Sequence, residues 1–548
     1  MRRALASGAQ SALLKGRANY VCLHRLERAG RDARLGSPEE AAHLQRIERF
    51  AAASASGDRA DLPDVPEDSP AWIHATSTRE NCLGQECPRY DACFVMKARR
   101  AALAADVVVV NHHLFFADVV LRDEGVAELL PACNTIILDE AHQLPETARL
   151  FFGETASSSR LAELARDARV ELAAAGGASR GLEAACARLE KAARDLRLAF
   201  GEEPSRMAWS QAAARDRFAP SLKSLAEAAC AADAALAAEA ERSEGLRACA
   251  RRAAEARGLL ERLAGDPDGE RVRWVEVYAQ AVQLHLTPLS CADLFRRQIE
   301  DVPRAWIFTS ATLSIAGAFA HYAREMGLEQ AEARSWPSPY DFKRQALLYV
   351  PSGLPADPND PGYTEAVVEA ALPVLEASGG RAFLLFTTLR ALRRARDLLA
   401  GRLPHPLLVQ GEGSRSALLE RFRSLGNAVL LGSASFREGV DVRGEALSVV
   451  ILDKLPFAPP DDPVLAARIE SLRARGGNPF AELQLPQAIL QLKQGAGRLI
   501  RDEDDRGVLM ICDPRLYSRP YGRTVLASLP PMARTRSLAD VQTFFAIR

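Results

Sequence analysis

Two carboxylates have the residue types and spacing needed to activate water on a nucleotide. Asp139 and Glu140 follow the apolar run Thr135–Leu138. Mg²⁺ prefers oxygen ligands, so Asp139 would hold it directly or through water, while Glu140 would orient and deprotonate the attacking water. A bare Asp-Glu pair is common by chance. Asp-Glu-Ala-His after four aliphatic or β-branched residues is a much stronger signal, and His142 would link this site to a neighbouring domain.

The complementary positive charge lies in the segment Gln494–Arg501, which reads Gln-Gly-Ala-Gly-Arg-Leu-Ile-Arg. Arg498 and Arg501 are expected to share one face of a helix. There they would neutralise charge that develops on the γ-phosphate. We place Gln494 in the same catalytic set and Gly497 in the nucleotide-binding set. The alternative is a surface helix with ordinary Arg–Asp pairs, because residues 502–505 are all acidic.

The loop that should cradle the triphosphate does not occur in this sequence. No Gly-x-x-x-x-Gly-Lys-Ser/Thr is present, and none of the seven lysines follows a glycine. Such a loop supplies the contacts to the β- and γ-phosphates. The chain therefore has the pattern of a nucleic-acid motor without its first segment, and we expect it to hydrolyse ATP very poorly alone.

Three further polar segments follow or lie near apolar runs. Ser310 and Thr312 follow the strand-like run that begins at Trp306 and would relay the nucleotide state to a nucleic-acid path, although helix capping is the simpler explanation. Asn111 and His112 would hydrogen-bond backbone or DNA phosphate. In the segment from residue 435 to 441, Phe436 and Arg437 would contact bases or phosphates. Glu438, Gly439 and Asp441 of the same segment would contact the nucleotide.

Four cysteines near the start of the chain have the spacing of a metal site. Cys82, Cys87 and Cys93 form a tight trio, and Cys22 is the best fourth ligand. These wide spacings suit a cuboidal iron–sulfur cluster. Zinc and four unrelated buried thiols remain as alternatives. The other cysteines are expected to be small buried hydrophobes: Cys133, Cys186, Cys230, Cys249, Cys291 and Cys512.

Short apolar runs separated by amphipathic stretches must position these residues. Runs of this kind predict strands that are buried on both faces of a parallel sheet, in an α/β doubly wound fold. Ligands of such sheets lie at the carboxyl ends of the strands, and we expect the polar residues above to lie there. The segment Leu161–Gly265 instead predicts long antiparallel helices. The predicted strands are Asp106–Asn111, Thr135–Asp139, Trp306–Ser310, Ala382–Thr387, Ala428–Ser433, Ser448–Asp453 and Gly507–Asp513.

Length and composition set the remaining limits. A chain of 548 residues suggests roughly three or four domains. The formal net charge of -1 means that any DNA path must come from local clustering of basic residues. No apolar run is long enough to span a bilayer, so we expect a cytoplasmic protein. In that compartment, ten cysteines indicate metal ligands or buried thiols rather than disulfides.

The order of these motifs resembles the XPD/DinG family of superfamily 2 helicases and is most similar to its YoaA-like branch. The resemblance covers nearly the whole chain. It rests on the cysteine trio, the Asp-Glu-Ala-His sequence and the Thr-Ser-Ala-Thr-Leu sequence. Five further segments match in the same order: Lys15–Cys22, Ala105–His113, Glu438–Asp441, Asp453–Phe457 and Gln494–Arg501.

The resemblance implies two RecA-like doubly wound parallel-sheet domains, the first interrupted by an iron–sulfur domain and a helical arch. The first RecA-like domain would comprise residues 1–21, 101–150 and 266–335, and the second residues 336–548. The iron–sulfur domain would comprise residues 22–100 and the arch residues 151–265.

The resemblance also implies a function. Family members hydrolyse ATP on single-stranded DNA and unwind duplex in the 5′-to-3′ direction, and their cluster domain and arch form a pore-like strand separator. The expected cofactors are a [4Fe–4S] cluster and Mg²⁺ with ATP, and the expected partners are single-stranded and forked duplex DNA and replication or repair proteins. We expect no membrane partner and a nucleoid-associated location.

One departure from the family leaves other functions open. Relatives carry the phosphate loop upstream of the Lys-Gly-Arg element, which here begins at Lys15. Without the preceding strand and helix, the first RecA-like domain would expose apolar surface. The chain would then act as an ATP-independent single-stranded DNA-binding protein with a structural cluster, or as a redox sensor whose cluster gates DNA binding.

Overall fold

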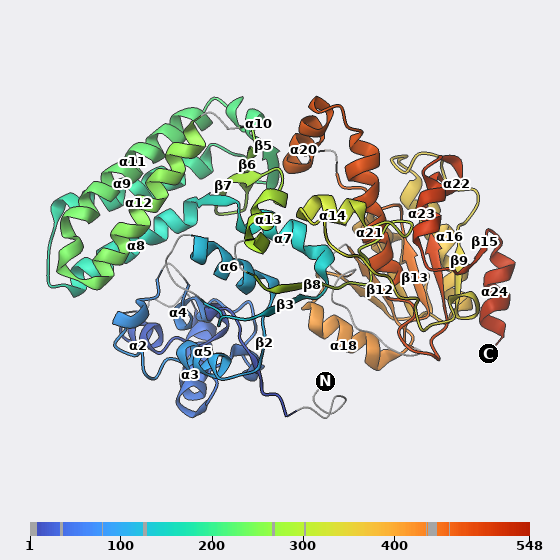
Figure 1. Cartoon of the computed structure of the whole chain (residues 1–548), viewed down its shortest axis with the longest axis horizontal. Coiled ribbons are helices and arrows are strands. Elements are labelled where there is room, and N and C mark those ends of the chain that lie inside the picture. The colour runs from blue at the N-terminus through green and yellow to red at the C-terminus, as the bar shows by residue number, and fades with distance from the viewer. Residues whose placement is uncertain are drawn as a thin grey trace. The chain divides into compact units, whose positions relative to one another are not determined.

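The protein was described with a computed structural model that covers residues 8–32, 37–78, 81–123, 129–265, 269–300, 303–433, 436, 446–459 and 461–547. The chain forms two compact units (Figure 1). Unit 1 comprises Met1–Leu138, Gln143–Ile307 and Asp461–Ala467, and unit 2 comprises Asp139–His142, Phe308–Pro460 and Arg468–Arg548. Each unit is described by itself below.

A seven-stranded parallel sheet forms the centre of unit 2, with strand order β11-β12-β10-β13-β14-β9-β15. All residues of its central strands are buried, because helices cover both faces. The structure confirms the four strands predicted here and adds three. The strands are β9 (Ala346–Tyr349), β10 (Ala382–Leu385), β11 (Leu407–Val409), β12 (Val429–Gly432), β13 (Val449–Leu452), β14 (Gly507–Ile511) and β15 (Ala533–Thr535).

Alternate residues of each strand enter two separate cores, one on each face of this sheet. In β10, Phe383 and Leu385 belong to one core, whereas Ala382 and Leu384 belong to the other. Thr388 and Ser414 cap two of the covering helices by accepting backbone N–H bonds. The helices of this unit include α14 (Ala320–Met326), α15 (Phe342–Gln345), α16 (Tyr363–Ala377), α17 (Leu389–Leu399), α18 (Arg415–Leu425), α21 (Leu485–Ala496) and α24 (Leu538–Ala546).

Two short pairs of strands in unit 1 carry exposed apolar side chains. β1 (Ser11–Leu13) pairs in parallel with β2 (Val107–Val109), and β3 (Thr135–Leu138) neighbours β8 (Ala305–Phe308). Val109 is 53% exposed and Ile137 is 64% exposed.

The cysteine-bearing segment of unit 1 packs around a small core of its own. Tyr20, Val21, Ile47, Trp72 and Phe94 are buried together. Ser37 accepts the Glu40 N–H bond and is followed by proline, so it begins a helix with two favourable signals. The helices are α2 (Leu23–Asp32), α3 (Pro38–Ala53), α4 (Ala71–Ala75) and α5 (Phe94–Leu103).

Four long helices follow, as the Ala- and Leu-rich sequence predicts: α8 (Ser158–Ala174), α9 (Arg180–Leu198), α11 (Phe218–Glu239) and α12 (Glu244–Ala264), drawn in cyan to green in Figure 1. None of the described helices is long and apolar enough to cross a membrane.

A four-stranded antiparallel sheet, which the sequence analysis did not predict, packs against the core of these helices. Its order is β4-β7-β6-β5, with β4 (Glu154–Ser157), β5 (Ser205–Ala208), β6 (Arg271–Val277) and β7 (Val282–Pro288). Two of these strands lie beyond residue 265, so the sheet extends past the predicted end of the arch. The four domain ranges remain a prediction.

Candidate functional site

Asp139 and Glu140 form a tight turn directly after β3. The backbone φ of Glu140 is +48°, a left-handed conformation that residues other than glycine rarely adopt. A 3₁₀ turn over Ala141–Gln143 and helix α7 (Leu144–Phe151) follow. Both acidic residues are exposed, so their carboxylates are accessible to a ligand from solvent.

The two carboxylates are held by the segment that follows β8. The hydroxyl of Thr309 donates to Asp139 Oδ1 at 2.8 Å, and that of Ser310 donates to Glu140 Oε2 at 3.2 Å. The backbone N–H of Ala141 donates to the carbonyl of Thr309 at 2.9 Å. The structure thus brings together two motifs that lie about 170 residues apart in the sequence.

His142 completes this network. Its Nδ1 lies 2.9 Å from Ser310 Oγ and 3.2 Å from Glu140 Oε2. The His142 side chain is 8% exposed, whereas that of Glu140 is 60% exposed. In the assignment of hydrogens that links all three residues, His142 Nδ1–H donates to Ser310 Oγ, and the Ser310 hydroxyl donates to Glu140. Ser310 Oγ also accepts the Thr312 N–H at 3.1 Å.

The surroundings of Asp139 fit a magnesium ligand. Its Oδ1 accepts bonds from the Thr309 hydroxyl and from the Glu140 N–H. Within the described residues, both bonds reach Oδ1, which leaves Oδ2 available on an exposed carboxylate. A hard oxygen donor beside a second carboxylate is the donor chemistry that Mg²⁺ requires.

The arginines lie elsewhere in unit 2 than predicted. Helix α21 ends at Ala496, so Arg498 lies in the turn after the helix and Arg501 beyond it. The expectation of a shared helical face was therefore wrong. The expectation that they lie at the carboxyl end of a strand was also wrong, because the segment precedes β14 and lies at its amino end. Gln494 is in the last turn of α21, and Gly497 caps that helix.

Thr312 and Phe436 are less accessible than their predicted DNA contacts require. Phe436 is 2% exposed, belongs to a hydrophobic core of unit 2 and lies 5.6 Å from the Arg415 guanidinium. Its ring is not available to stack on a base, which corrects the prediction. Thr312 is 7% exposed, and its hydroxyl lies 3.3 Å from Ser310 Oγ, inside the network described above. Arg437, Glu438, Gly439 and Asp441 lie outside the described residues.

Asn111 has a structural contact. Its Oδ1 accepts the Leu114 N–H at 2.8 Å at the start of helix α6 (His112–Asp123). Asparagine in this position caps a helix. The residue is exposed, and its predicted contact with DNA remains a prediction, as does that of His112.

The four cysteines with ligand spacing are all partly exposed and interact electrostatically. Burial raises the pKa of the Cys22 thiol, and Cys82, Cys87 and Cys93 raise it further. Within the described part of the chain, no three His, Cys, Asp or Glu side chains already converge as ligands of one metal ion. The thiols are therefore near one another without forming a finished ligand set.

The remaining cysteines divide into two groups. Cys186, Cys249, Cys291 and Cys512 are buried, as predicted. Cys133 and Cys230 are exposed, which corrects the prediction that they are buried hydrophobes. The Arg304 guanidinium lies 3.9 Å from the sulfur of Cys133.

Two residues that the sequence analysis did not select hold the backbone of the two segments that carry this network. The buried Tyr322 hydroxyl donates to the carbonyl of Ala141 at 2.9 Å. The Lys493 ammonium donates to the carbonyl of Ser314 at 2.8 Å, and burial lowers the pKa of Lys493. Both contacts join residues more than 150 positions apart, and no local pattern in the sequence signals them.

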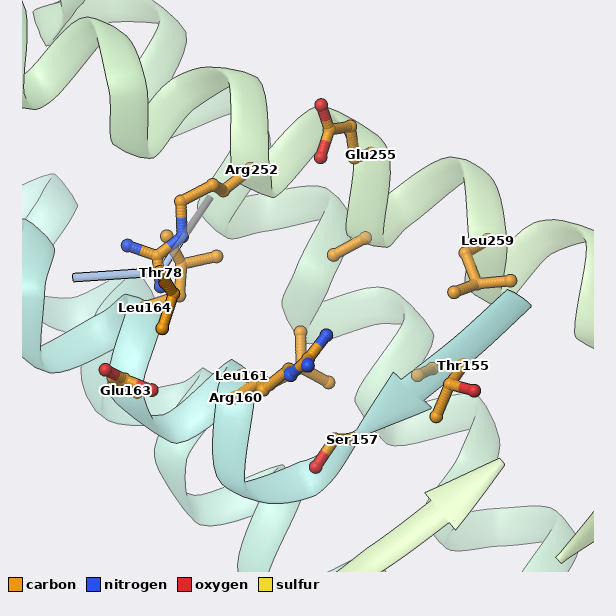
Figure 2. Close-up of a pocket in the computed structure, with 12 residues that line it drawn as sticks. Thr78, Thr155, Ser157, Arg160, Leu161, Glu163, Leu164, Arg252, Glu255 and Leu259 are labelled. Atoms are coloured by element: carbon orange, nitrogen blue, oxygen red, sulfur yellow. The ribbon is translucent and has the colours of Figure 1, made fainter. Parts of the chain in front are cut away.

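A separate pocket of about 200 Å³ lies in unit 1 between β4, α8, α12 and Thr78 (Figure 2). Arg160 and Arg252 line it, but so do Glu163 and Glu255, and Arg252 pairs with Asp167 at 2.7 Å. The charges balance, so this pocket does not have the character of a phosphate site.

The chain is similar to curated helicases over nearly its whole length. It is 45% identical over 541 residues to the ATP-dependent DNA helicase YoaA of Escherichia coli, covering 98% of this chain and 84% of that one. It is 40% identical to the YoaA of Haemophilus influenzae, covering 99% and 85%. It is 34% identical to the ATP-dependent helicase DinG of Mycobacterium tuberculosis, covering 97% and 82%.

A family model and a solved structure agree with these relatives. The helicase C-terminal domain model matches residues 371–532. A solved XPD helicase has a TM-score of 0.56 at 15% identity, covering 97% of this chain and 89% of that one, which supports the fold. The chain belongs to the XPD/DinG family of helicases, in its YoaA-like branch.

Proposed function

We propose that this protein is an ATP-dependent DNA helicase whose hydrolytic site is built on Asp139 and Glu140. The observation that carries the proposal is the hydrogen-bonded network joining these carboxylates to Thr309, Ser310 and His142. A structural turn does not need two solvent-facing carboxylates, each bound by its own hydroxyl. A phosphoryl-transfer site needs both, because one positions an ion and the other a water.

The residues divide the work as follows. Mg²⁺ bound with the nucleotide would supply positive charge to the phosphate oxygens, and Asp139 would hold it. Glu140 accepts the proton of the attacking water at its carboxylate. Ser310 and His142 restrict the motion of Glu140, so that the carboxylate is oriented before the water arrives. Arg498 and Arg501 would stabilise the charge that develops on the transferred phosphoryl group.

We also propose that Cys22, Cys82, Cys87 and Cys93 hold a [4Fe–4S] cluster. Four thiolates are the donor set of such a cluster, and the spacing of Cys82, Cys87 and Cys93 with Cys22 supports the proposal. The cluster would fix the segment between Cys22 and α5 in a closed loop.

The substrate and location follow from the family as proposals. We propose movement in the 5′-to-3′ direction on single-stranded and forked duplex DNA, in repair or replication, together with proteins of those processes. We propose a cytoplasmic, nucleoid-associated protein. The strand-separating elements would be the cysteine-bearing segment and the four-helix segment, within the domain ranges given above.

These 548 residues contain no phosphate loop, and we propose that they hydrolyse ATP poorly by themselves. The test uses this chain and a chimera, the loop-completed chain, in which a segment containing Gly-x-x-x-x-Gly-Lys-Ser/Thr is joined ahead of residue 1. The loop-completed chain should hydrolyse ATP when single-stranded DNA is present.

Glu140→Gln should retain ATP binding in the loop-completed chain and lose turnover by about 100-fold or more. Glu146→Gln, a change of the same type six residues later, is the matched control and should retain turnover. Normal turnover in Glu140→Gln would refute the assigned role. DNA binding that is indifferent to ATP in both chains would favour the ATP-independent DNA-binding protein instead.

A further inference from the structure

The segment that carries Arg501 is folded tightly on itself before it enters β14. Oδ2 of Asp505 accepts the backbone N–H of Arg501 at 2.7 Å and that of Asp502 at 2.9 Å. Asp505 is 8% exposed although its neighbours Asp502, Glu503 and Asp504 are accessible. The Asp505 carboxylate therefore holds the backbone at the start of this segment in place. We call residues 501–506 the arginine loop.

A side chain from another element fills the centre of the arginine loop. Nε2 of Gln345 lies 3.1 Å, 2.9 Å and 3.0 Å from the carbonyl oxygens of Asp502, Glu503 and Asp505, respectively. Gln345 is 8% exposed. An amide nitrogen has two hydrogens, so three converging carbonyls share them. The Tyr340 hydroxyl donates to a fourth carbonyl, that of Arg501, at 2.7 Å.

Strand register explains why these parts meet. Gln345 is the last residue of α15 and immediately precedes β9. The arginine loop immediately precedes β14, which pairs in parallel with β9 so that Gly507 faces Ala346. The two segments thus enter neighbouring strands at the same level. The amino-end position of Gln345 lets it reach the loop without a long connection.

We propose that Gln345 is a positioning residue that fixes the backbone of the arginine loop and, through it, the guanidinium of Arg501. The inference rests on the proposed function for the role of Arg501. A group that stabilises charge in the transition state must be held in place, and a displacement of about 1 Å can cost about 100-fold in rate. Tyr340 and Gln345 supply side-chain donors to the carbonyls of residues 501, 502, 503 and 505, and the carbonyl of Asp502 also accepts the backbone N–H of Asp505 at 3.3 Å.

Two substitutions separate donation from packing. Gln345→Met keeps the length of the side chain but removes the amide N–H donor. The carbonyls of Asp502, Glu503 and Asp505 then lose their bonds from residue 345. Gln345→Lys restores donation, because an ammonium group has three hydrogens for three carbonyls and is attracted by the acidic loop. Gln542→Met, at an exposed position of α24, is the matched control.

The first arm of the test measures backbone amide exchange in the 548-residue chain by mass spectrometry, without nucleotide. Peptides covering residues 501–506 should exchange at least about tenfold faster in Gln345→Met and close to the wild-type rate in Gln345→Lys and Gln542→Met. Unchanged exchange in Gln345→Met would show that Gln345 does not hold the backbone of the arginine loop, whatever the protein does with ATP.

The second arm measures DNA-stimulated ATP hydrolysis in the loop-completed chain. Gln345→Met should lower kcat about 10- to 100-fold with little change in KM for ATP, and Gln345→Lys should recover most of it. In an Arg501→Ala background, Gln345→Met should have no further effect, because the residue acts through Arg501.

The outcomes of this arm are distinct. Additive losses in the double variant, or an altered KM alone, would overturn the positioning role. A wild-type loop-completed chain without any ATP hydrolysis would instead refute the proposed function and with it any catalytic role of Gln345, while the exchange arm would still decide whether Gln345 holds the loop.

Discussion

Ser310→Ala probes the network on which the hydrolytic assignment depends. The Ser310 hydroxyl touches three members of this network, since Oγ contacts Glu140 Oε2, His142 Nδ1 and the Thr312 N–H. Alanine removes these contacts and the 3.3 Å contact with the Thr312 hydroxyl, and leaves Asp139, Thr309 and the backbone in place. The direct contact of 3.2 Å between His142 and Glu140 also survives.

The expected magnitude follows from these contacts. A hydrogen bond to a charged group contributes about 1.5–3 kcal/mol. The Glu140 side chain is 60% exposed and keeps His142, so the lower end applies, about 1.5 kcal/mol. If this energy orients Glu140 for the attacking water, kcat should fall about tenfold while KM for ATP changes little.

The assay is DNA-stimulated ATP hydrolysis by the loop-completed chain, with Ser314→Ala as the control. Ser314 lies in the same segment, and its link to Lys493 uses the backbone carbonyl, which the substitution retains. Ser314→Ala should therefore hydrolyse ATP as the wild type does. Equal rates for Ser310→Ala and the wild type, or equal losses in both variants, would refute the view that the Ser310 hydroxyl orients Glu140.

Three other expectations concern the cluster, the nucleic acid and the second unit. Cys87→Ser should abolish the brown absorbance of an iron–sulfur protein, and an unchanged spectrum would disprove the ligand assignment. Single-stranded DNA affinity should fall as salt rises, with a log–log slope of about -0.7 per phosphate contact; a flat response in a binding titration would exclude a path along the backbone. Burial raises the pKa of Asp453 to about 6, so the folded state favours its protonated form. Protonation of Asp453 stabilises the folded state fully below about pH 4, and this stabilisation is lost as the pH rises through 6. The free energy of unfolding of Asp453→Asn should therefore rise by up to about 3 kcal/mol relative to that of the wild type between these two pH values. Denaturant titrations of both proteins at several pH values measure this gain, and a difference independent of pH would contradict it.

The strands that end at functional residues could be predicted because they are continuous apolar runs. Ser448–Asp453 was predicted as a strand, and β13 comprises Val449–Leu452. The polar residue after such a run marks the end of the strand, as Asp139 does after β3. The long helices could also be predicted from the sequence, because their Ala- and Leu-rich composition favours helix over a long stretch.

The antiparallel sheet was missed for a different reason. The sequence Arg-Val-Arg-Trp-Val-Glu-Val of β6 is rich in β-branched and aromatic residues, which are typical of strands, and this signal was available. The two outer strands of the sheet, β4 and β5, have four residues each and no comparable pattern. Their structure comes from pairing with β7 and β6, which no local window contains.

The arginine segment shows that helical spacing alone is not sufficient. Glycines at 495 and 497 weaken the helix, which ends between them at Ala496. That signal could have been used. The contacts of Gln345 with the arginine loop could not, because they join positions 157 to 160 residues apart through the register of two strands.

The most direct test of the account is strand separation of a forked DNA duplex by the loop-completed chain with Mg²⁺ and ATP. The account predicts ATP-dependent unwinding by the loop-completed chain, its loss in the Glu140→Gln form, and little or none by the 548-residue chain. A folded loop-completed chain that binds the fork but neither hydrolyses ATP nor separates the strands would contradict it.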